Sequence, residues 1–328
     1  MTEPFPAYRA PKWLPGGHAQ TIYPLLIKPT APPYRRDRWD TPDGDFIDLD
    51  WIDGPADSPL LLLFHGLEGS STSHYAISLM AAVRAMHWTG VVSHFRGCSG
   101  ELNRLPRAYH SGDSDEIDWV LRRLRQQFPR RPIFAAGVSL GGNALLKWLG
   151  EREATAGDVI NAAAAISAPL DLTACGHHLG RGFNRIYTQH FLQTLKKNAA
   201  EKLARFPDIF DGLRMARARN LYEFDDVVTA PLHGFLGATD YWRRASAKPL
   251  LPGIGIPTLL LNARNDPFLP EHALPTPNEI SPQVHLELPR EGGHVGFVTG
   301  SLPGRLDWLP QRLLEFFSGA AMRRTPCA

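Results

Sequence analysis

Short apolar segments alternate with stretches of helical periodicity through much of this 328-residue chain. The apolar segments predict strands, and the periodic stretches predict helices. Before residue 170 the predicted strands are 46–51, 60–64, 90–95, 132–137 and 159–167. The predicted helices between them are 75–86, 113–128 and 141–149. Alternation at these lengths predicts a mostly parallel α/β sheet with helices on both faces.

The alternation stops between residues 170 and 250, where only helical patterns occur. Two helical pieces are predicted there from the spacing of apolar residues. The first contains Phe191, Leu195, Ala199 and Leu203, and the second contains Phe206, Ile209, Phe210 and Leu213. Strands are predicted again at 257–262 and 284–288, followed by a closing helix at 308–317. A helical insertion therefore interrupts one α/β unit.

These patterns divide the chain into four parts. The proline-rich N-terminal segment shows no clear period and is expected to lie as an extended arm on the core. The helical insertion is expected to cover the sheet as a lid. The expected parts are an arm at 1–45, a core at 46–169 and 251–320, a lid at 170–250 and a tail at 321–328.

Composition narrows the classes of partner. The chain has 35 basic and 33 acidic residues, a balance that gives no reason to expect binding to nucleic acid. Three cysteines do not predict a disulfide framework, and no Cys/His spacing predicts a metal site. No secretory signal or transmembrane segment is recognisable. We expect a cytoplasmic protein without a metal, and peripheral contact with lipid stays open.

The sequence Gly-Val-Ser-Leu-Gly at 137–141 joins a predicted strand to a predicted helix. This is the arrangement of a nucleophile elbow, in which a serine sits on a tight turn. Gly137 and Gly141 fit the turn because the strand and helix backbones crowd at those two positions. We therefore predict that Ser139 is a nucleophile. The alternative is a glycine-rich turn with an incidental serine.

A serine hydroxyl needs a general base, and that base needs an acid to orient it. Folds with this elbow carry the three residues in the chain order serine, acid, histidine. Asp266 is the carboxylate in the loop after the first late strand, and His294 follows the last strand. His285 lies within a strand pattern and His272 in a proline-rich loop, so we predict His294 as the base. For Asp266 the alternative is a turn residue before proline.

Acyl transfer also requires N–H groups that stabilise an oxyanion. One is expected from Leu140, directly after the serine, and the other from the loop after the strand at 60–64. We predict the N–H of Leu67 as this second donor. The residues expected to support the loop are His65, Gly66, Glu68 and Gly69. Its histidine and glutamate are expected to brace the loop through hydrogen bonds rather than to act in catalysis.

Two further features invite other interpretations. Cys98 follows a predicted strand at the same edge of the sheet, but no histidine motif pairs with it. We therefore predict a packed small side chain rather than a thiol nucleophile. His177 and His178 are adjacent in the insertion, with no carboxylate spacing to support a metal. A surface or lid role is preferred for them.

Several motifs together resemble the YheT-like branch of the α/β-hydrolases, which is related to ABHD-type lipases. The motifs lie at 65–69, 95–100, 137–143 and 292–297, with further similarity at 17–21, 229–235 and 240–241. The resemblance extends from about residue 11 to 318. It implies the α/β-hydrolase fold, carboxylesterase or acylglycerol-lipase activity, no cofactor, and a triad of Ser139, Asp266 and His294. The family often has an acidic residue just before the catalytic aspartate, where this chain has Asn265.

The leading hypothesis is therefore a serine hydrolase that cleaves small-molecule or lipid carboxylic esters through an acyl-enzyme. Apolar helical faces in the insertion are expected to line an acyl pocket, or else simply to pack the lid on the core. Two alternatives remain. One is acyl transfer to an acceptor other than water by the same triad. The other is a non-catalytic binding protein on a hydrolase fold, which predicts that a triad residue is missing.

Overall fold

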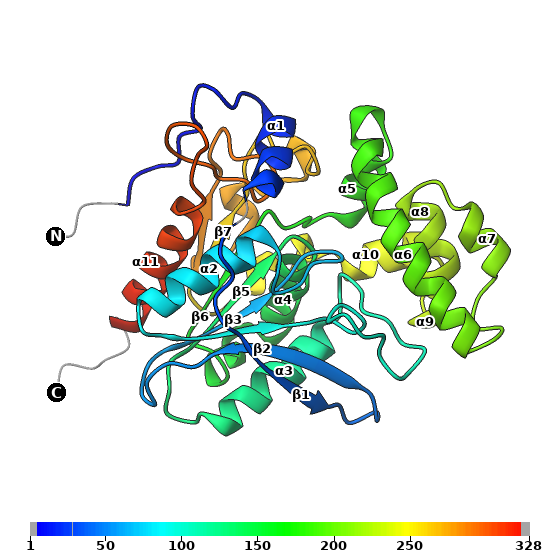
Figure 1. Cartoon of the computed structure of the whole chain (residues 1–328), viewed down its shortest axis with the longest axis horizontal. Coiled ribbons are helices and arrows are strands. Elements are labelled where there is room, and N and C mark those ends of the chain that lie inside the picture. The colour runs from blue at the N-terminus through cyan, green and yellow to red at the C-terminus, as the bar shows by residue number, and fades with distance from the viewer. Residues whose placement is uncertain (1–4, 28, 323–328) are drawn as a thin grey trace.

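A single mixed sheet runs through the core of the molecule (Figure 1). The computed structural model describes residues 5–27 and 29–322, and eight strands in these residues form the sheet in the order β1-β2-β4-β3-β5-β6-β7-β8. All neighbours pair in parallel from β4 to β8, while β2 is antiparallel to both β1 and β4. The strands are β1 Arg35–Asp40, β2 Phe46–Ile52, β3 Leu60–Phe64, β4 Thr89–Ser93, β5 Ile133–Val138, β6 Ala162–Ile166, β7 Thr258–Leu261 and β8 Val284–Glu287. The predicted mostly parallel sheet is confirmed.

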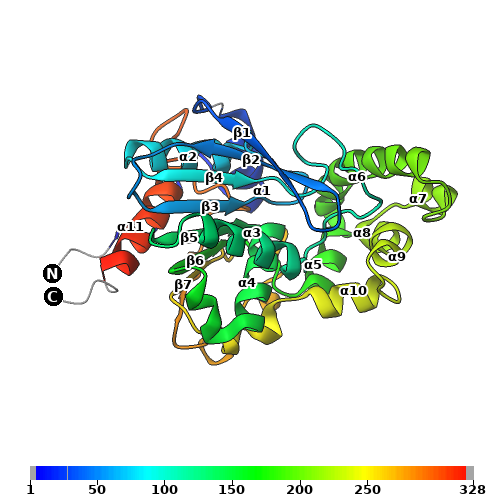
Figure 2. The ribbon, with the colours of Figure 1, turned by 90° about the horizontal axis from the view of Figure 1, so that it is seen from below.

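Helices cover both faces of the sheet (Figure 2). Leu60, Leu62 and Phe64 of β3 pack toward α3 and α4, whereas Leu61 and Leu63 pack toward α2 and α11. A strand covered on both faces needs apolar residues throughout, which explains the run of leucines. The core helices are α2 His74–Ala85, α3 Ser114–Gln127, α4 Leu140–Arg152 and α11 Trp308–Met322.

The insertion at 170–250 is a helical cap beyond the carboxyl ends of the central strands, shown in green to yellow in Figure 1. We call these residues the lid. The lid's helices are α5 Leu172–Leu179, α6 Arg185–Arg205, α7 Gly212–Arg217, α8 Leu221–Phe224, α9 Ala230–Leu232 and α10 Ala238–Ala245. Its first predicted helical piece lies within α6. The second, across 206–213, is wrong because the chain turns there at Pro207 and at Asp208, whose φ is 65°.

The arm is more structured than expected. Helix α1 (Gly17–Ile22) and a short 3-10 helix (Tyr23–Leu26) replace part of the extended segment. The sheet also begins before the expected core boundary at residue 46, because β1 pairs with β2. Strand β1 is mostly charged, and two of its arginines pair with acidic residues directly opposite: Arg36 with Asp50 and Arg38 with Asp48. These ion pairs take the place of the apolar alternation that marks the other strands.

The C-terminal helix α11 runs to Met322, so the expected tail begins inside a helix and residues 323–328 of it lie outside the described residues. Across 5–27 and 29–322, none of the helices combines the length and the apolar character needed to cross a membrane.

Candidate active site

Ser139 lies on a sharp turn between β5, which ends at Val138, and α4, which begins at Leu140. Its backbone has φ 52° and ψ −118°, a conformation that non-glycine residues rarely adopt. The Ser139 N–H donates to the carbonyl of Ile166 at 2.8 Å, which anchors the turn to β6. Backbone strain of this kind persists only where the surroundings impose it.

The glycines around the serine are required by close backbone contacts. A Cβ atom at Gly137 would lie 2.5 Å from the carbonyl oxygen of Gly141. A Cβ atom at Gly141 would lie 2.5 Å from the carbonyl oxygen of His65 and 2.6 Å from that of Phe64. The second contact presses the elbow against the loop after β3, so the two predicted parts of the site are adjacent.

The three side chains predicted to act together lie within hydrogen-bond distance of one another. His294 Nε2 is 3.0 Å from Ser139 Oγ, and His294 Nδ1 is 2.8 Å from Asp266 Oδ2. The Asp266 side chain is fully buried, and 11% of the His294 side chain is exposed. This arrangement orients the imidazole so that Nε2 can accept the serine proton, while the carboxylate accepts the Nδ1–H.

Phe268 fixes the remaining freedom of the aspartate and the histidine. Its backbone N–H donates to Asp266 Oδ1 at 2.8 Å, so both carboxylate oxygens have donors. Its ring stacks on the His294 imidazole, with 4.0 Å between ring centroids. The turn that carries Asp266 therefore also packs against one face of the His294 ring.

The loop after β3 packs directly against the serine. A Cβ atom at Gly66 would lie 3.1 Å from Ser139 Cβ, and a Cβ atom at Gly69 would lie 2.7 Å from the Tyr75 hydroxyl. In the described part of the chain, the N–H of Leu67 has no hydrogen-bond acceptor. The N–H of Leu140, in the first turn of α4, has no carbonyl of its own helix to bond. Among residues 5–27 and 29–322, neither predicted oxyanion donor thus has a hydrogen-bond partner.

His65 braces this loop. Its Nδ1–H donates to the Gly66 carbonyl at 2.8 Å, and its Nε2 accepts from the Phe95 N–H at 3.0 Å. Burial lowers the pKa of His65 to about 3, so the ring stays neutral at physiological pH. Both nitrogens are occupied, which leaves none for a substrate.

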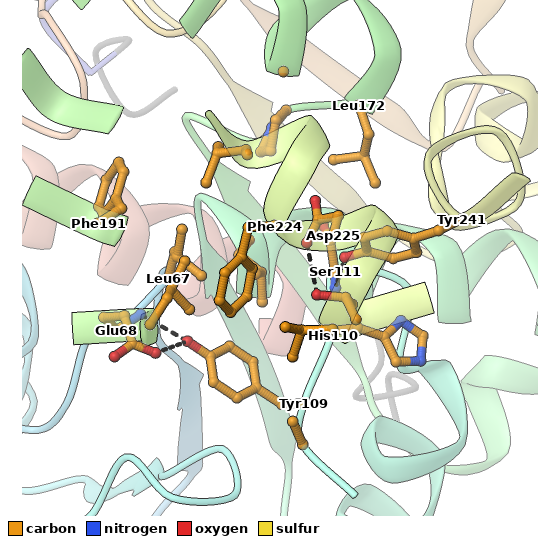
Figure 3. A pocket seen from close by; sticks show the side chains of 18 of the residues that line it. Leu67, Glu68, Tyr109, His110, Ser111, Leu172, Phe191, Phe224, Asp225 and Tyr241 are labelled. Atoms are coloured by element: carbon orange, nitrogen blue, oxygen red, sulfur yellow. Dashed lines mark hydrogen bonds between the residues drawn. The ribbon is translucent and has the colours of Figure 1, made fainter. Parts of the chain in front are cut away.

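Glu68 is held by both the core and the lid. The Tyr109 hydroxyl accepts the Glu68 N–H at 2.8 Å and donates to Glu68 Oε1 at 2.7 Å (Figure 3). Asn198 of α6 donates to Glu68 Oε2 at 3.0 Å. Burial raises the pKa of the Glu68 carboxyl above its usual range. Tyr109 and Asn198, which sequence reasoning missed, therefore tie the loop that carries the Leu67 N–H to a second core loop and to the lid.

The arm braces the histidine loop from the other side. Gln20 is fully buried, and its Oε1 accepts the Gly292 N–H and the Asn265 side-chain amide, each at 2.9 Å. Thr21 Oγ1 accepts the His294 N–H at 2.9 Å. Sequence reasoning noted 17–21 and Asn265 only as points of comparison with a family. It missed that the amide at position 265 serves as a donor to Gln20.

An apolar cavity opens from Ser139 beneath the lid (Figure 3). The core contributes Leu67, Leu140 and part of the loop at 96–111, and the lid lines the other side. The lid residues along it include Leu172, Phe191, Leu195, Phe224, Val228 and Trp242. Buried hydroxyl and acidic groups lie on the same wall, among them Asp225, whose pKa is raised to about 6 by burial.

Cys98 and His177, for which other roles were considered, both contact neighbouring side chains. Cys98 packs against the main core cluster, and burial raises its pKa well above the usual value. His177 is exposed on the lid and contacts the rings of Tyr222 and Trp242. Among the residues that the structure describes, no group of three or more His, Cys, Asp or Glu side chains is arranged to hold a metal ion.

Comparison with known proteins agrees with this geometry. Residues 59–301 match the family described as the alpha/beta hydrolase fold. This chain belongs to that family. It is 43% identical to the Escherichia coli protein named "Putative esterase YheT", over 92% of this chain and 90% of that protein. It is also 30% identical to mouse "Phospholipase ABHD3", over 93% of this chain and 76% of that protein.

A solved structure gives the same fold. The Pyrococcus furiosus esterase Pf2001 superposes with a TM-score of 0.54 at 16% identity, covering 90% of this chain and 99% of that one. The predicted fold class and the YheT-like resemblance are therefore confirmed, and the chain is a hydrolase-fold protein with esterase and lipase relatives.

Proposed function

We propose that this protein hydrolyses carboxylic esters, with Ser139 as nucleophile, His294 as general base and Asp266 as the group that orients the histidine. The observation that carries the proposal is the continuous hydrogen-bonded arrangement of these side chains at the end of an apolar cavity. Relatives named as an esterase, a phospholipase and a monoacylglycerol lipase support an ester substrate.

The reaction takes place in two halves. Ser139 Oγ attacks the ester carbonyl while His294 Nε2 takes the hydroxyl proton, and the N–H groups of Leu67 and Leu140 stabilise the oxyanion. His294 then gives its proton to the alcohol oxygen as the C–O bond breaks, which leaves an acyl-enzyme. In the second half, His294 activates a water that attacks the acyl carbon and releases the carboxylic acid.

The buried carboxylate of Asp266 stabilises the imidazolium that forms in each half. The oxyanion donors need no rearrangement, since one is at the helix start and the other is held by the bracing of His65 and Glu68. A preorganised pair of donors is among the largest contributions to acyl transfer.

Replacement of the nucleophile tests the mechanism. Ser139→Ala should reduce turnover of a p-nitrophenyl ester by a factor of about 10⁴ or more while leaving the circular dichroism spectrum unchanged. Ser301→Ala, at an exposed serine that lines neither cavity at the site, is the control. A fluorophosphonate probe should label the wild type and fail to label Ser139→Ala. Retained hydrolysis or labelling in that variant would exclude Ser139 as the nucleophile.

The cavity suggests that the acyl chain lies beneath the lid. Val228 is a buried lid residue on its wall, so Val228→Phe should shorten the preferred chain in a p-nitrophenyl ester series. Unchanged chain preference would mean that the lid's apolar residues only pack the lid on the core. Product analysis with added glycerol separates hydrolysis from acyl transfer, because a transferase would form a new ester.

A further inference from the structure

Large apolar side chains are exposed on two segments that are distant in sequence. The exposed fractions are 64% for Leu25 and 70% for Leu26 in the arm, and 52% for Phe183 and 57% for Ile186 at the start of the lid's long helix. Ile22 of α1 is also exposed. We call these five residues the apolar rim. Clusters of exposed apolar side chains mark interaction surfaces more often than isolated ones do.

Direct contacts bring the two segments together. His18 Nδ1 of α1 lies 3.0 Å from the Tyr187 hydroxyl of α6. The His18 ring also packs on Phe183, with 4.6 Å between centroids. Figure 1 shows α1, in dark blue, and the α5–α6 corner, in green, on the same upper edge of the molecule. The rim is therefore one surface, formed jointly by the arm and the lid.

A second cavity leads from this surface to the candidate active site. Its outer wall includes Leu25 and Ile27 of the arm and His190 of the lid, and its inner wall includes Ser139 and His294. This opening is distinct from the apolar cavity that lies deeper under the lid, although the two meet at the serine. A molecule that enters past the rim reaches the reacting groups directly.

The charge of the two segments selects the kind of partner. No Asp or Glu occurs at residues 4–36 or at 172–200. Arg181 and Arg185 are exposed beside Phe183, and in the described residues neither guanidinium has an acidic partner. Exposed apolar side chains and free basic groups, on segments that carry no acidic residue of their own, favour an anionic lipid surface, which takes apolar groups into its interior and attracts cations to its headgroups.

We propose that the apolar rim docks the protein on an anionic lipid bilayer, so that a lipid ester passes from the bilayer through the second cavity to Ser139. The surface argument is independent of turnover, whereas the path to the serine rests on the proposed function. Docking at this rim would place the cavity opening against the bilayer, and the ester would not have to cross water.

Binding is measured with the full chain carrying Ser139→Ala, so that the lipids are not consumed. Vesicles of phosphatidylcholine alone are compared with vesicles that also contain phosphatidylglycerol, by co-sedimentation. Binding should be stronger with phosphatidylglycerol and should weaken as salt is raised. Replacing Leu26, Phe183 and Ile186 together by serine should weaken binding about tenfold or more. Arg181→Gln combined with Arg185→Gln should lower the preference for phosphatidylglycerol about tenfold.

The control uses apolar residues elsewhere on the lid that are at least as exposed. Leu236 is 96% exposed and Leu213 is 72% exposed, and neither belongs to the rim. Leu213→Ser with Leu236→Ser should bind vesicles like the parent. With Ser139 intact, the rim variant should still hydrolyse a short water-soluble ester at the parent's rate. It should lose hydrolysis of a long-chain ester that has the same headgroup and is embedded in vesicles. This readout separates a failure of docking from a failure of hydrolysis.

Three results would overturn the proposal. The first is vesicle binding that the rim and control variants reduce equally. The second is the absence of vesicle binding by the parent protein. The third is a dimer in light scattering that the rim variant converts to a monomer, which would assign the rim to contact between two copies of the chain.

Discussion

The core and the lid contribute to the site by different means. Around Ser139 the core uses the backbone. It supplies a strained turn, glycines at which any side chain would clash with neighbouring backbone, and N–H groups left free beside the serine. The lid uses side chains, which line a cavity and reach the core through a few hydrogen bonds such as that of Asn198 to Glu68. The difference suggests that changes to the core should affect the rate of reaction, and changes to the lid should affect which ester reacts.

The largest effect is expected where two core backbones touch. Gly141→Ala would place a methyl group against two carbonyl oxygens of β3 and its loop. We expect a loss of about 1–3 kcal/mol in the free energy of unfolding. We also expect at least about a 100-fold loss in kcat, because the elbow and the Leu67 loop must separate. Urea unfolding and steady-state kinetics measure the two effects.

Gly319→Ala is the control, since a Cβ at Gly319 in α11 meets nothing within 4 Å. It should raise stability by about 0.5–1 kcal/mol and leave kcat unchanged. Equal behaviour of the two variants would contradict the close contact at the elbow.

A smaller effect is expected where the arm supports the histidine loop. Gln20→Ala would leave the buried Gly292 N–H and the Asn265 amide without their acceptor. Each unpaired buried group costs about 1–3 kcal/mol, and kcat should fall about tenfold or more as His294 loses its fixed position. Gln189→Ala removes an exposed amide from α6 and controls for the loss of a glutamine. Full activity in Gln20→Ala would show that the arm only covers the core.

The sequence predicted the parts of the site that local patterns encode. A strand, two glycines and a helix specify the elbow, and the chain order of the fold then points to Asp266 and His294, which the structure brings together with Ser139. Gln20 was not predicted in this way, because its partner Gly292 is 272 residues away and no local pattern marks the contact.

Strand β1 and the lid show the same limit. Cross-strand ion pairs hold β1, so the apolar period that revealed the other strands is absent from it. In the lid, a period of apolar residues continued past Arg205 although Pro207 and a positive φ at Asp208 end the helix. The spacing of apolar residues alone does not reveal where this helix ends.

A still smaller effect is expected from changes at the contact between the core and the lid. Tyr109→Phe removes the acceptor for the Glu68 N–H and the donor to its carboxylate, but leaves the ring stacked on Phe95. We expect kcat for a short ester to fall by about 5- to 10-fold with little change in KM, because the lost hydroxyl positions the oxyanion loop while the ring that lines the cavity is kept. Asn198→Ala, on the lid side, should have a smaller effect.

Tyr222→Phe, which removes a hydroxyl that bonds Thr239 at the lid surface, is the matched control. If Tyr109→Phe raised KM and left kcat intact, Tyr109 would instead contribute to ground-state binding of the ester, and the division between core and lid would be weaker.

The smallest expected effect concerns how the lid is fastened to the core. Lys202 of α6 is buried, and its ammonium donates to Asn103 Oδ1 at 2.7 Å and to the Leu105 and Arg107 carbonyls at 2.9 and 2.8 Å. Burial lowers the pKa of Lys202 from 10.5 to about 8. Between these values the folded protein has released a proton that the unfolded chain still holds, so this group's contribution to the free energy of unfolding rises with pH.

Lys202→Met removes that titration. The difference in unfolding free energy, wild type minus variant, should therefore increase from about pH 8 to about pH 10.5 and be constant below that window. Lys197→Met, an exposed lysine on the same helix, controls for loss of a charge. A difference that stays flat across the window would mean that Lys202 is not buried against the loop at 103–107. The lid would then be held to the core by its apolar contacts and by its other hydrogen bonds, such as that of Asn198 to Glu68.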